Sequence, residues 1–386
     1  MHTLYRWRTG LLAAAALTAT LAVATPAAAQ PSGPAASGTA ATGTTATGNA
    51  ASGNASSTPT VSAEAWAAGR AAYGANATAA QAVESFWTPE RMRAAKPIED
   101  SAAYLDAVRT YDANAKAAQE RAATASNGPA KTAATPHSVV PKDGYVGTFA
   151  QPAAYNPGFS YWQPTARTSG KVFFQMGSGY FQCSGTIVNS EGQNTVWTAG
   201  HCVNQGGGSG VWAYNWQFVP SYDDDLANPR PYGTWTATQL WSRTAWINNS
   251  DFAEDMGVAI MGMNFGYHIV GYLGGQGITT SVGNNVWENT FGYPAEGPFD
   301  GGNLYECWGY ISPEWQVLFW WSETTKVPCD MTRGESGGGW LYAWDGNWGY
   351  LNGVNSRIDQ IVNPTITLSP YFDGTAWSLY NATRYL

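Results

Sequence analysis

From about Gly144 onward, the sequence is a series of short apolar runs, rich in β-branched and aromatic residues and separated by glycine, asparagine, aspartate and proline. Such runs are typical of β-strands joined by tight turns. Clear examples are Val172–Phe174, Gly185–Val188, Thr195–Trp197 and Val258–Ile260. Charged residues make up only 12% of the chain. Roughly 240 residues of this kind predict an all-β barrel or sandwich.

The first 29 residues have the pattern of an export signal. Two arginines precede an apolar run from Gly10 to Val23, and Ala27–Ala29 supplies small residues for cleavage. The pattern predicts a signal peptide over residues 1–29 and a secreted, extracellular protein. A membrane anchor is the alternative, but the apolar run is short and interrupted by threonine.

Two further regions precede the strand-rich part. Residues 30–62 consist almost entirely of Ala, Gly, Ser, Thr, Pro and Asn, which predicts a disordered low-complexity spacer. Residues 63–139 are rich in Ala, Glu, Arg and Lys and predict helices followed by a linker. Phe86 and Trp87 form an aromatic anchor there, followed by a helix start in which Thr88 is the cap and Pro89 the first helical residue. Residues 140–386 would then be the main domain.

Charge is distributed unevenly along the chain. Residues 1–139 contain 10 Lys/Arg and 8 Asp/Glu, a net charge of +2, and the remainder contains 9 and 19, a net charge of −10. An acidic main domain argues against nucleic acid and anionic membranes as partners.

Four cysteines lie in the strand-rich part, and in an exported protein they predict two disulfides. Three pairings are formally possible. We favour the sequential one, Cys183–Cys202 and Cys307–Cys329, which closes loops with separations of 19 and 22 residues.

Only one of the four histidines has the surroundings of a catalytic group. His2 lies in the predicted signal peptide, His137 lies in the predicted linker, and no motif surrounds His268. His201 directly follows a predicted strand, in the sequence TAGHC. A turn of small residues would expose the imidazole, and a neighbouring disulfide would fix it, as a general base requires.

Ser336 is the candidate nucleophile, because it lies in the glycine-rich sequence GESGGG. Glycines allow the backbone to direct successive N–H groups at one point, so the amides of Gly334 and Ser336 could form an oxyanion hole. The α/β-hydrolase arrangement requires a histidine after the serine, and residues 337–386 contain none. The subtilisin order requires an aspartate before the histidine, and only Asp143 is available in the strand-rich part. The remaining order is His, Asp, Ser.

Asp255 is the candidate third member, because it opens the apolar, strand-like run DMGVAI. A carboxylate at that point would be partly buried and could orient an imidazole. Asp251 and Glu254 are close alternatives. Asp223–Asp225 are more typical of a solvated turn or a weak cation site.

At three motifs the sequence resembles the trypsin/chymotrypsin-like serine peptidases: TAGHC at 198–202, DMGVA at 255–259 and GESGG at 334–338. The resemblance covers about residues 140–386. It implies two antiparallel six-stranded β-barrels with the site in the cleft between them, and it supports the Cys183–Cys202 pair. It also implies that Ser336 attacks the substrate, that His201 acts as base and then acid, and that Asp255 orients His201.

Within this family, the sequence most resembles the secreted bacterial branch that includes glutamyl endopeptidases. FVP at 218–220 and PYGTW at 231–235 are similar to that branch's segment between the histidine and the aspartate. That branch implies a propeptide, a role that residues 30–139 would fill by covering the acidic domain.

Two features depart from the animal enzymes of the family. The sequence has no Ile-Val-Gly-Gly start, and Glu335 precedes the nucleophile in place of aspartate. The resemblance suggests Asp330 and Asn355 as specificity-pocket residues. However, Thr332 stands where the family has a cysteine, and Asn355 could equally be a turn residue.

The sequence therefore predicts a secreted serine endopeptidase, made as a precursor and monomeric. Its partners would be protein or peptide substrates and its own propeptide, and no cofactor or metal is implied. A secreted serine esterase with the same triad and a non-catalytic binding or adhesion protein are the alternatives.

Overall fold

A computed structural model describes residues 47–49, 53–124, 135–144, 159–317, 320–359 and 365–386. The predicted signal peptide and most of the predicted spacer lie outside these residues. Within the described part of the chain, no helix is long and apolar enough to cross a membrane.

The first half of the main domain is a closed antiparallel barrel of six strands. Hydrogen bonds connect the strands in the order β9-β10-β7-β6-β5-β8, and β8 pairs back onto β9. All four strand runs expected from the sequence lie in this barrel. The strands are β5 (Ser169–Met176), β6 (Gly179–Val188), β7 (Thr195–Thr198), β8 (Tyr214–Pro220), β9 (Trp235–Arg243) and β10 (Gly257–Met261).

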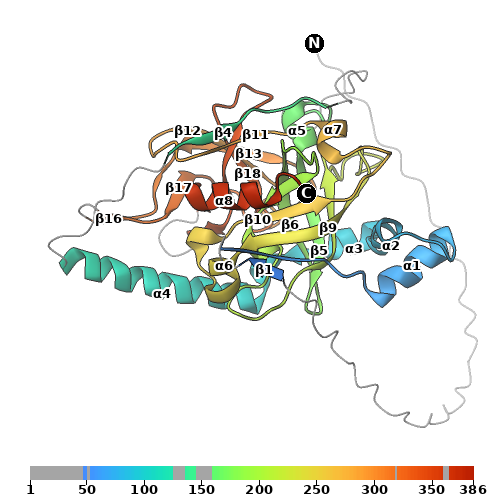
Figure 1. Cartoon of the computed structure of the whole chain (residues 1–386), viewed down its shortest axis with the longest axis horizontal. Coiled ribbons are helices and arrows are strands. Elements are labelled where there is room, and N and C mark those ends of the chain that lie inside the picture. The colour runs from blue at the N-terminus through green and yellow to red at the C-terminus, as the bar shows by residue number, and fades with distance from the viewer. Residues whose placement is uncertain (1–46, 50–52, 125–134, 145–158, 318–319, 360–364) are drawn as a thin grey trace, which may run out of the picture. The chain divides into compact units, whose positions relative to one another are not determined.

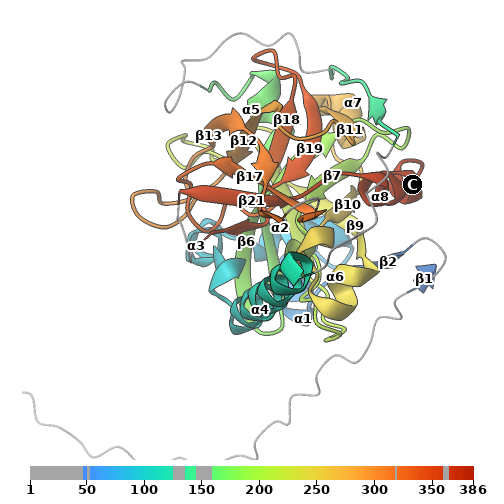
Figure 2. The ribbon, with the colours of Figure 1, turned by 90° about the vertical axis from the view of Figure 1, so that its left-hand side faces the viewer.

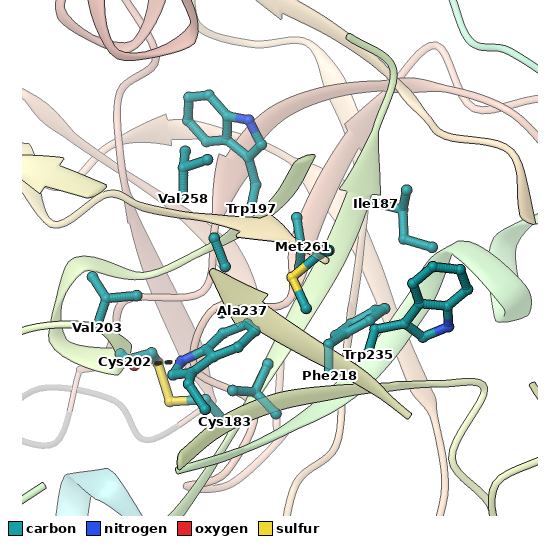
Figure 3. Packing of buried hydrophobic residues seen from close by; sticks show 14 of the residues in the cluster. Cys183, Ile187, Trp197, Cys202, Val203, Phe218, Trp235, Ala237, Val258 and Met261 are labelled. Carbon is teal, nitrogen blue, oxygen red and sulfur yellow. Dashed lines mark hydrogen bonds between the residues drawn. A yellow bond between two sulfur atoms is a disulfide. The ribbon is translucent and has the colours of Figure 1, made fainter. Parts of the chain in front are cut away.

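Large aromatic and β-branched side chains from the strands of this barrel are buried in the main hydrophobic core. Trp197, Trp235, Phe218 and Val258 are fully buried, and Figure 3 shows them around a common core. The Cys183–Cys202 disulfide lies at the edge of the same core. Burial on this scale explains why so many tryptophans occur in a chain with few charges.

The second half consists of two sheets. One has the order β13-β12-β18-β19-β11-β4, and the other has the order β14-β17-β21-β20. The Cys307–Cys329 disulfide links β13 to the residue that follows β17. The strands of the first sheet are β4 (His137–Val139), β11 (Gly277–Thr280), β12 (Trp287–Gly292), β13 (Tyr305–Tyr310), β18 (Gly339–Tyr342) and β19 (Tyr350–Val354). Those of the second are β14 (Ser312–Pro313), β17 (Thr324–Pro328), β20 (Arg357–Ile358) and β21 (Ile366–Pro370), and a separate pair is β15 (Gln316–Val317) and β16 (Trp320–Trp321).

Short helices connect and cover the sheets. They are α5 (Pro164–Thr168), η3 (Gly200–Cys202), α6 (Thr244–Asn249), η4 (Phe252–Glu254), α7 (Ile269–Leu273) and α8 (Gly374–Thr383). The mostly β architecture and both disulfides predicted from the sequence are therefore confirmed.

Residues 53–124, called the N-terminal segment below, are mainly helical, as the sequence predicts. Figures 1 and 2 show these helices along one side of the β-structure. Thr88 caps α3 by accepting a hydrogen bond from the Arg91 N–H, and Pro89 is the first helical residue. The elements are β2 (Asn54–Ser57), α1 (Ala63–Tyr73), α2 (Ala79–Phe86), α3 (Pro89–Ala94), β3 (Lys96–Pro97), η1 (Ile98–Asp100) and α4 (Ala102–Thr124).

One expectation is wrong at the start of this segment. The predicted disordered spacer over 30–62 includes Asn54–Ser57, which form the buried strand β2 and pair with β9. A further short strand, β1 (Thr47–Asn49), pairs with β2. Backbone hydrogen bonds to an existing sheet edge do not require apolar side chains, so composition alone does not reveal this strand.

Candidate active site

His201 and Asp255 meet because two strands of the first barrel pair. β7 and β10 are antiparallel, with Gly257 opposite Thr198, so the residues just outside this pairing lie beside each other. His201 Nδ1 is 2.8 Å from Asp255 Oδ2, and the His201 backbone N–H donates to Asp255 Oδ1 at 2.8 Å. The carboxylate therefore fixes both the ring and the backbone of His201.

Asp255 receives a third hydrogen bond from the second half of the domain. The Ser356 hydroxyl donates to Asp255 Oδ2 at 2.6 Å. The two alternatives face elsewhere: Asp251 caps η4 through the Ala253 N–H, and Glu254 pairs with Arg243. Of these three acidic residues, Asp255 is the one that contacts His201.

Ser336 lies in the loop before β18, and both halves of the domain hold this loop. From the first barrel, the Ser184 N–H donates to the Ser336 carbonyl at 2.6 Å, and the Ser184 hydroxyl donates to the Gly334 carbonyl at 3.1 Å. From the second half, the Asn355 carbonyl accepts from the Gly337 N–H at 2.7 Å. The candidate nucleophile is thus fixed at the junction of the two halves.

Two positions in this loop require glycine. Gly337 has a φ of 82°, and a Cβ there would lie 2.0 Å from Thr198 Oγ1. Gly334 has a φ of 101°, and a Cβ there would lie 2.8 Å from the Tyr293 carbonyl oxygen. Glycine adopts these left-handed conformations without strain, so both glycines shape the backbone of the loop that carries Ser336.

The comparisons with known proteins identify the family of this chain. No protein-family model and no curated protein matches the sequence. Among solved structures, the thermostable serine protease AL20 from an extremophilic microorganism is 33% identical with a TM-score of 0.52, and the match covers 57% of this chain and 97% of AL20. Protease Anisep from Arthrobacter nicotinovorans is 33% identical with a TM-score of 0.53, and the match covers 58% and 98% of the two chains. The chain belongs to the chymotrypsin-like serine proteases.

In this protease, the Ser336 hydroxyl contacts a residue that the sequence analysis did not single out. It donates to Glu99 Oε1 at 2.5 Å, and the Gly334 N–H donates to the same oxygen at 3.0 Å. His201 Nε2 is buried and has no hydrogen-bond partner among the described residues. No local motif marks Glu99, which lies 237 positions before Ser336 in the sequence.

The N-terminal segment also covers His201 of the protease. The ring of Tyr104 packs edge-on against the imidazole, with ring centroids 4.8 Å apart, and its hydroxyl donates to the Ser356 carbonyl at 2.9 Å. Beside this contact, a cavity of about 580 Å³ lies between α4 and the loop that carries Ser336. Glu99, Tyr104, Arg333, Glu335, Ser336 and Arg357 are among its lining residues.

The structure does not bring the two suggested pocket residues to this cavity of the protease. Asp330 is exposed, and its Oδ1 lies 4.0 Å from Cys307 Sγ. Asn355 is fully buried, where its Oδ1 accepts from Thr290 and Trp340 and its Nδ2 donates to two backbone carbonyls. With its amide fully used in this way, Asn355 supports the nucleophile loop.

Glu335 of the protease is a buried carboxyl group next to the nucleophile. Burial is the main cause that raises its pKa, to about 8, and the negative charges of Glu99 and Asp330 raise it further. A hydrogen bond from the Thr367 hydroxyl at 2.9 Å lowers it in part. Glu335 is therefore mostly protonated at neutral pH and adds little charge beside Ser336.

Proposed function

We propose that this protein is a secreted serine endopeptidase that is made as a precursor. Ser336 is the nucleophile, His201 is the general base and then the acid, and Asp255 orients His201. The Gly334 and Ser336 amides stabilise the oxyanion. The observation that carries the proposal is the buried Asp255–His201 pair beside a glycine-framed serine, in a chain of this family.

In the proposed reaction, His201 Nε2 takes the proton of the Ser336 hydroxyl as the oxygen attacks the scissile carbonyl carbon. His201 then gives this proton to the leaving amine, and an acyl-enzyme remains on Ser336. Water, deprotonated by the same imidazole, releases the acid product. Asp255 keeps the proton on Nδ1 and stabilises the imidazolium, a role that suits its three hydrogen bonds.

A secreted origin is supported by the export pattern at residues 1–29 and by the two disulfides. A precursor form is supported by the N-terminal segment, which covers the candidate site. The segment would be removed on activation, and it is the partner that we propose besides the protein substrate.

The test expresses the full chain and compares the secreted wild type with Ser336→Ala and with Ser209→Ala, an exposed serine as matched control. We expect the wild type and Ser209→Ala to cleave a peptide library and to be labelled by a fluorophosphonate. Ser336→Ala should lose labelling and about 10⁴-fold or more of the activity.

Three outcomes contradict parts of this proposal. Full activity of Ser336→Ala would exclude the mechanism. Hydrolysis of simple esters with an uncleaved peptide library would instead favour the esterase alternative. The secreted chain is sequenced from its N-terminus in parallel, and an active form that begins near residue 30 would argue against a precursor.

A further inference from the structure

A carboxyl group of the N-terminal segment contacts both the proposed nucleophile and a proposed oxyanion donor of this protease. We propose that Ser336 and Gly334 form a carboxylate-binding site whose ligand is Glu99, so that the N-terminal segment inhibits the enzyme as a tethered carboxylate. This inference rests on the proposed function, because it assigns an inhibitor to the same site.

The two donors to Glu99 are the groups that catalysis requires. The Gly334 N–H, one of the two proposed oxyanion donors, binds Glu99 Oε1 at 3.0 Å. The Ser336 hydroxyl donates to that oxygen at 2.5 Å, so its proton is not directed at His201. An oxygen of Glu99 therefore occupies one of the two proposed oxyanion donors, and the described hydrogen bonds include none between Ser336 and His201 Nε2.

A carboxylate is also a suitable inhibitor chemically. Its carbon is a poor electrophile, because both oxygens share the negative charge and no leaving group is present. Hydrogen bonds from N–H and O–H groups to a charged acceptor are about twice as strong as neutral ones. Glu99 is only 4% exposed, so water competes little for these donors. The segment therefore occupies the centre with a group that Ser336 does not cleave.

Contacts on both sides of Glu99 hold it in place. Before it, β3 pairs with β6 of the first barrel at Lys96 and Pro97. After it, Asp100 accepts a hydrogen bond from Arg333 at 2.7 Å. Further along, Tyr104 packs against His201 and bonds to the Ser356 carbonyl. Because these contacts lie on successive parts of the segment, Glu99 enters the oxyanion hole from a fixed backbone.

The experiment measures how fast a fluorophosphonate labels Ser336 in the full-length precursor, with intact mass used to select uncleaved chains. The variants are Glu99→Gln, Glu99→Ala and the matched control Glu90→Gln, whose exposed carboxylate pairs with Arg93 and hydrogen-bonds with Thr88 at the start of α3. We expect labelling to rise about tenfold or more in Glu99→Ala and by a smaller factor in Glu99→Gln, which keeps an acceptor oxygen but loses the charge. Glu90→Gln should match the wild type.

Wild-type labelling rates in both Glu99 variants, with unchanged circular dichroism and melting temperature, would overturn the proposal. If the Glu99 variants cleave themselves before isolation while Glu90→Gln stays intact, that result supports it. A form freed of the N-terminal segment is labelled alongside. Rapid labelling of that form, together with unchanged labelling of the precursor in the Glu99 variants, would reject inhibition by the Glu99 carboxylate and leave the proposed function standing. If no folded form is labelled, the proposed function itself is rejected.

Discussion

Buried carboxyl groups in this protease differ in how many donors surround them. Asp255 accepts three hydrogen bonds. Glu288, on β12, accepts one from the Asn352 amide, at 2.5 Å, and its other oxygen is buried without a partner among the described residues. Burial raises the pKa of Glu288 to about 8, and the Asn352 hydrogen bond lowers it only in part. Glu288 is therefore protonated near neutral pH for the same reason as Glu335.

This buried acid should make stability depend on pH. The folded chain holds the Glu288 proton up to about pH 8, whereas the unfolded chain releases it near 4.5. The stabilising contribution is thus complete below pH 4.5 and is lost as the pH rises toward 8. We expect the free energy of unfolding of Glu288→Gln to rise relative to that of the wild type between pH 5 and pH 8.5, by roughly a few kcal/mol. Urea unfolding of both proteins at these two pH values measures this change. If the stabilities of the two proteins change in parallel with pH, the prediction is wrong.

Local sequence distinguishes some candidate site residues more sharply than others. His201 and Ser336 lie in distinctive turns, where small residues and glycines shape the backbone around one reactive side chain. The family resemblance suggests Asp330 and Asn355, and it does so for Asp330 through its position six residues before Ser336. Neither motif nor position shows which way a loop directs its side chains, and neither residue lines the cavity beside Ser336.

At the scale of elements, the N-terminal segment shows what a short motif can predict. Thr88 and Pro89 mark the start of α3 because a cap and a fixed φ act within one turn. Trp87, predicted as an anchor, is fully buried, and its indole N–H donates to the Asn215 carbonyl at 2.7 Å. Its ring packs 5.7 Å from that of Phe173 in β5. The motif alone does not show that Trp87 packs against Phe173 and bonds to Asn215.

Replacing this anchor should loosen the segment. We expect Trp87→Ala to reduce the free energy of unfolding of the precursor by about 3–5 kcal/mol, because a large side chain and a buried hydrogen bond are lost together. Tyr73→Ala is the control, since Tyr73 is 50% exposed on α1. Denaturant unfolding of the precursor provides the measurement. Equal losses in the two variants would show that Trp87 does not anchor the segment.

For the whole molecule, each half of the main domain carries one disulfide. Cys183–Cys202 ties β6 to the turn that bears His201, and Cys307–Cys329 ties β13 to the chain leading to Ser336. Each cross-link shortens the unfolded chain by closing a loop, with separations of 19 and 22 residues. Stabilisation by such loops varies only slowly with their length.

Loss of either disulfide should therefore cost a similar amount. We expect the double variants Cys183→Ala/Cys202→Ala and Cys307→Ala/Cys329→Ala each to lose about 3 kcal/mol of unfolding free energy. Guanidinium unfolding in the absence of reductant measures the loss, and wild type with reductant is the reference for removal of both. A loss well under 1 kcal/mol in either variant would contradict the loop argument.

The sequence by itself determined what depends on neighbours in the chain: short strands, helix starts and the chain order of the candidate residues His201, Asp255 and Ser336. These follow from periodicity, capping and spacing, which act over a few residues or along one chain direction. Only the tertiary structure placed Ser356 on Asp255, β2 on the edge of β9 and Glu99 against Gly334 and Ser336. Each of these contacts joins segments about a hundred or more positions apart, and nothing local in either partner encodes the other.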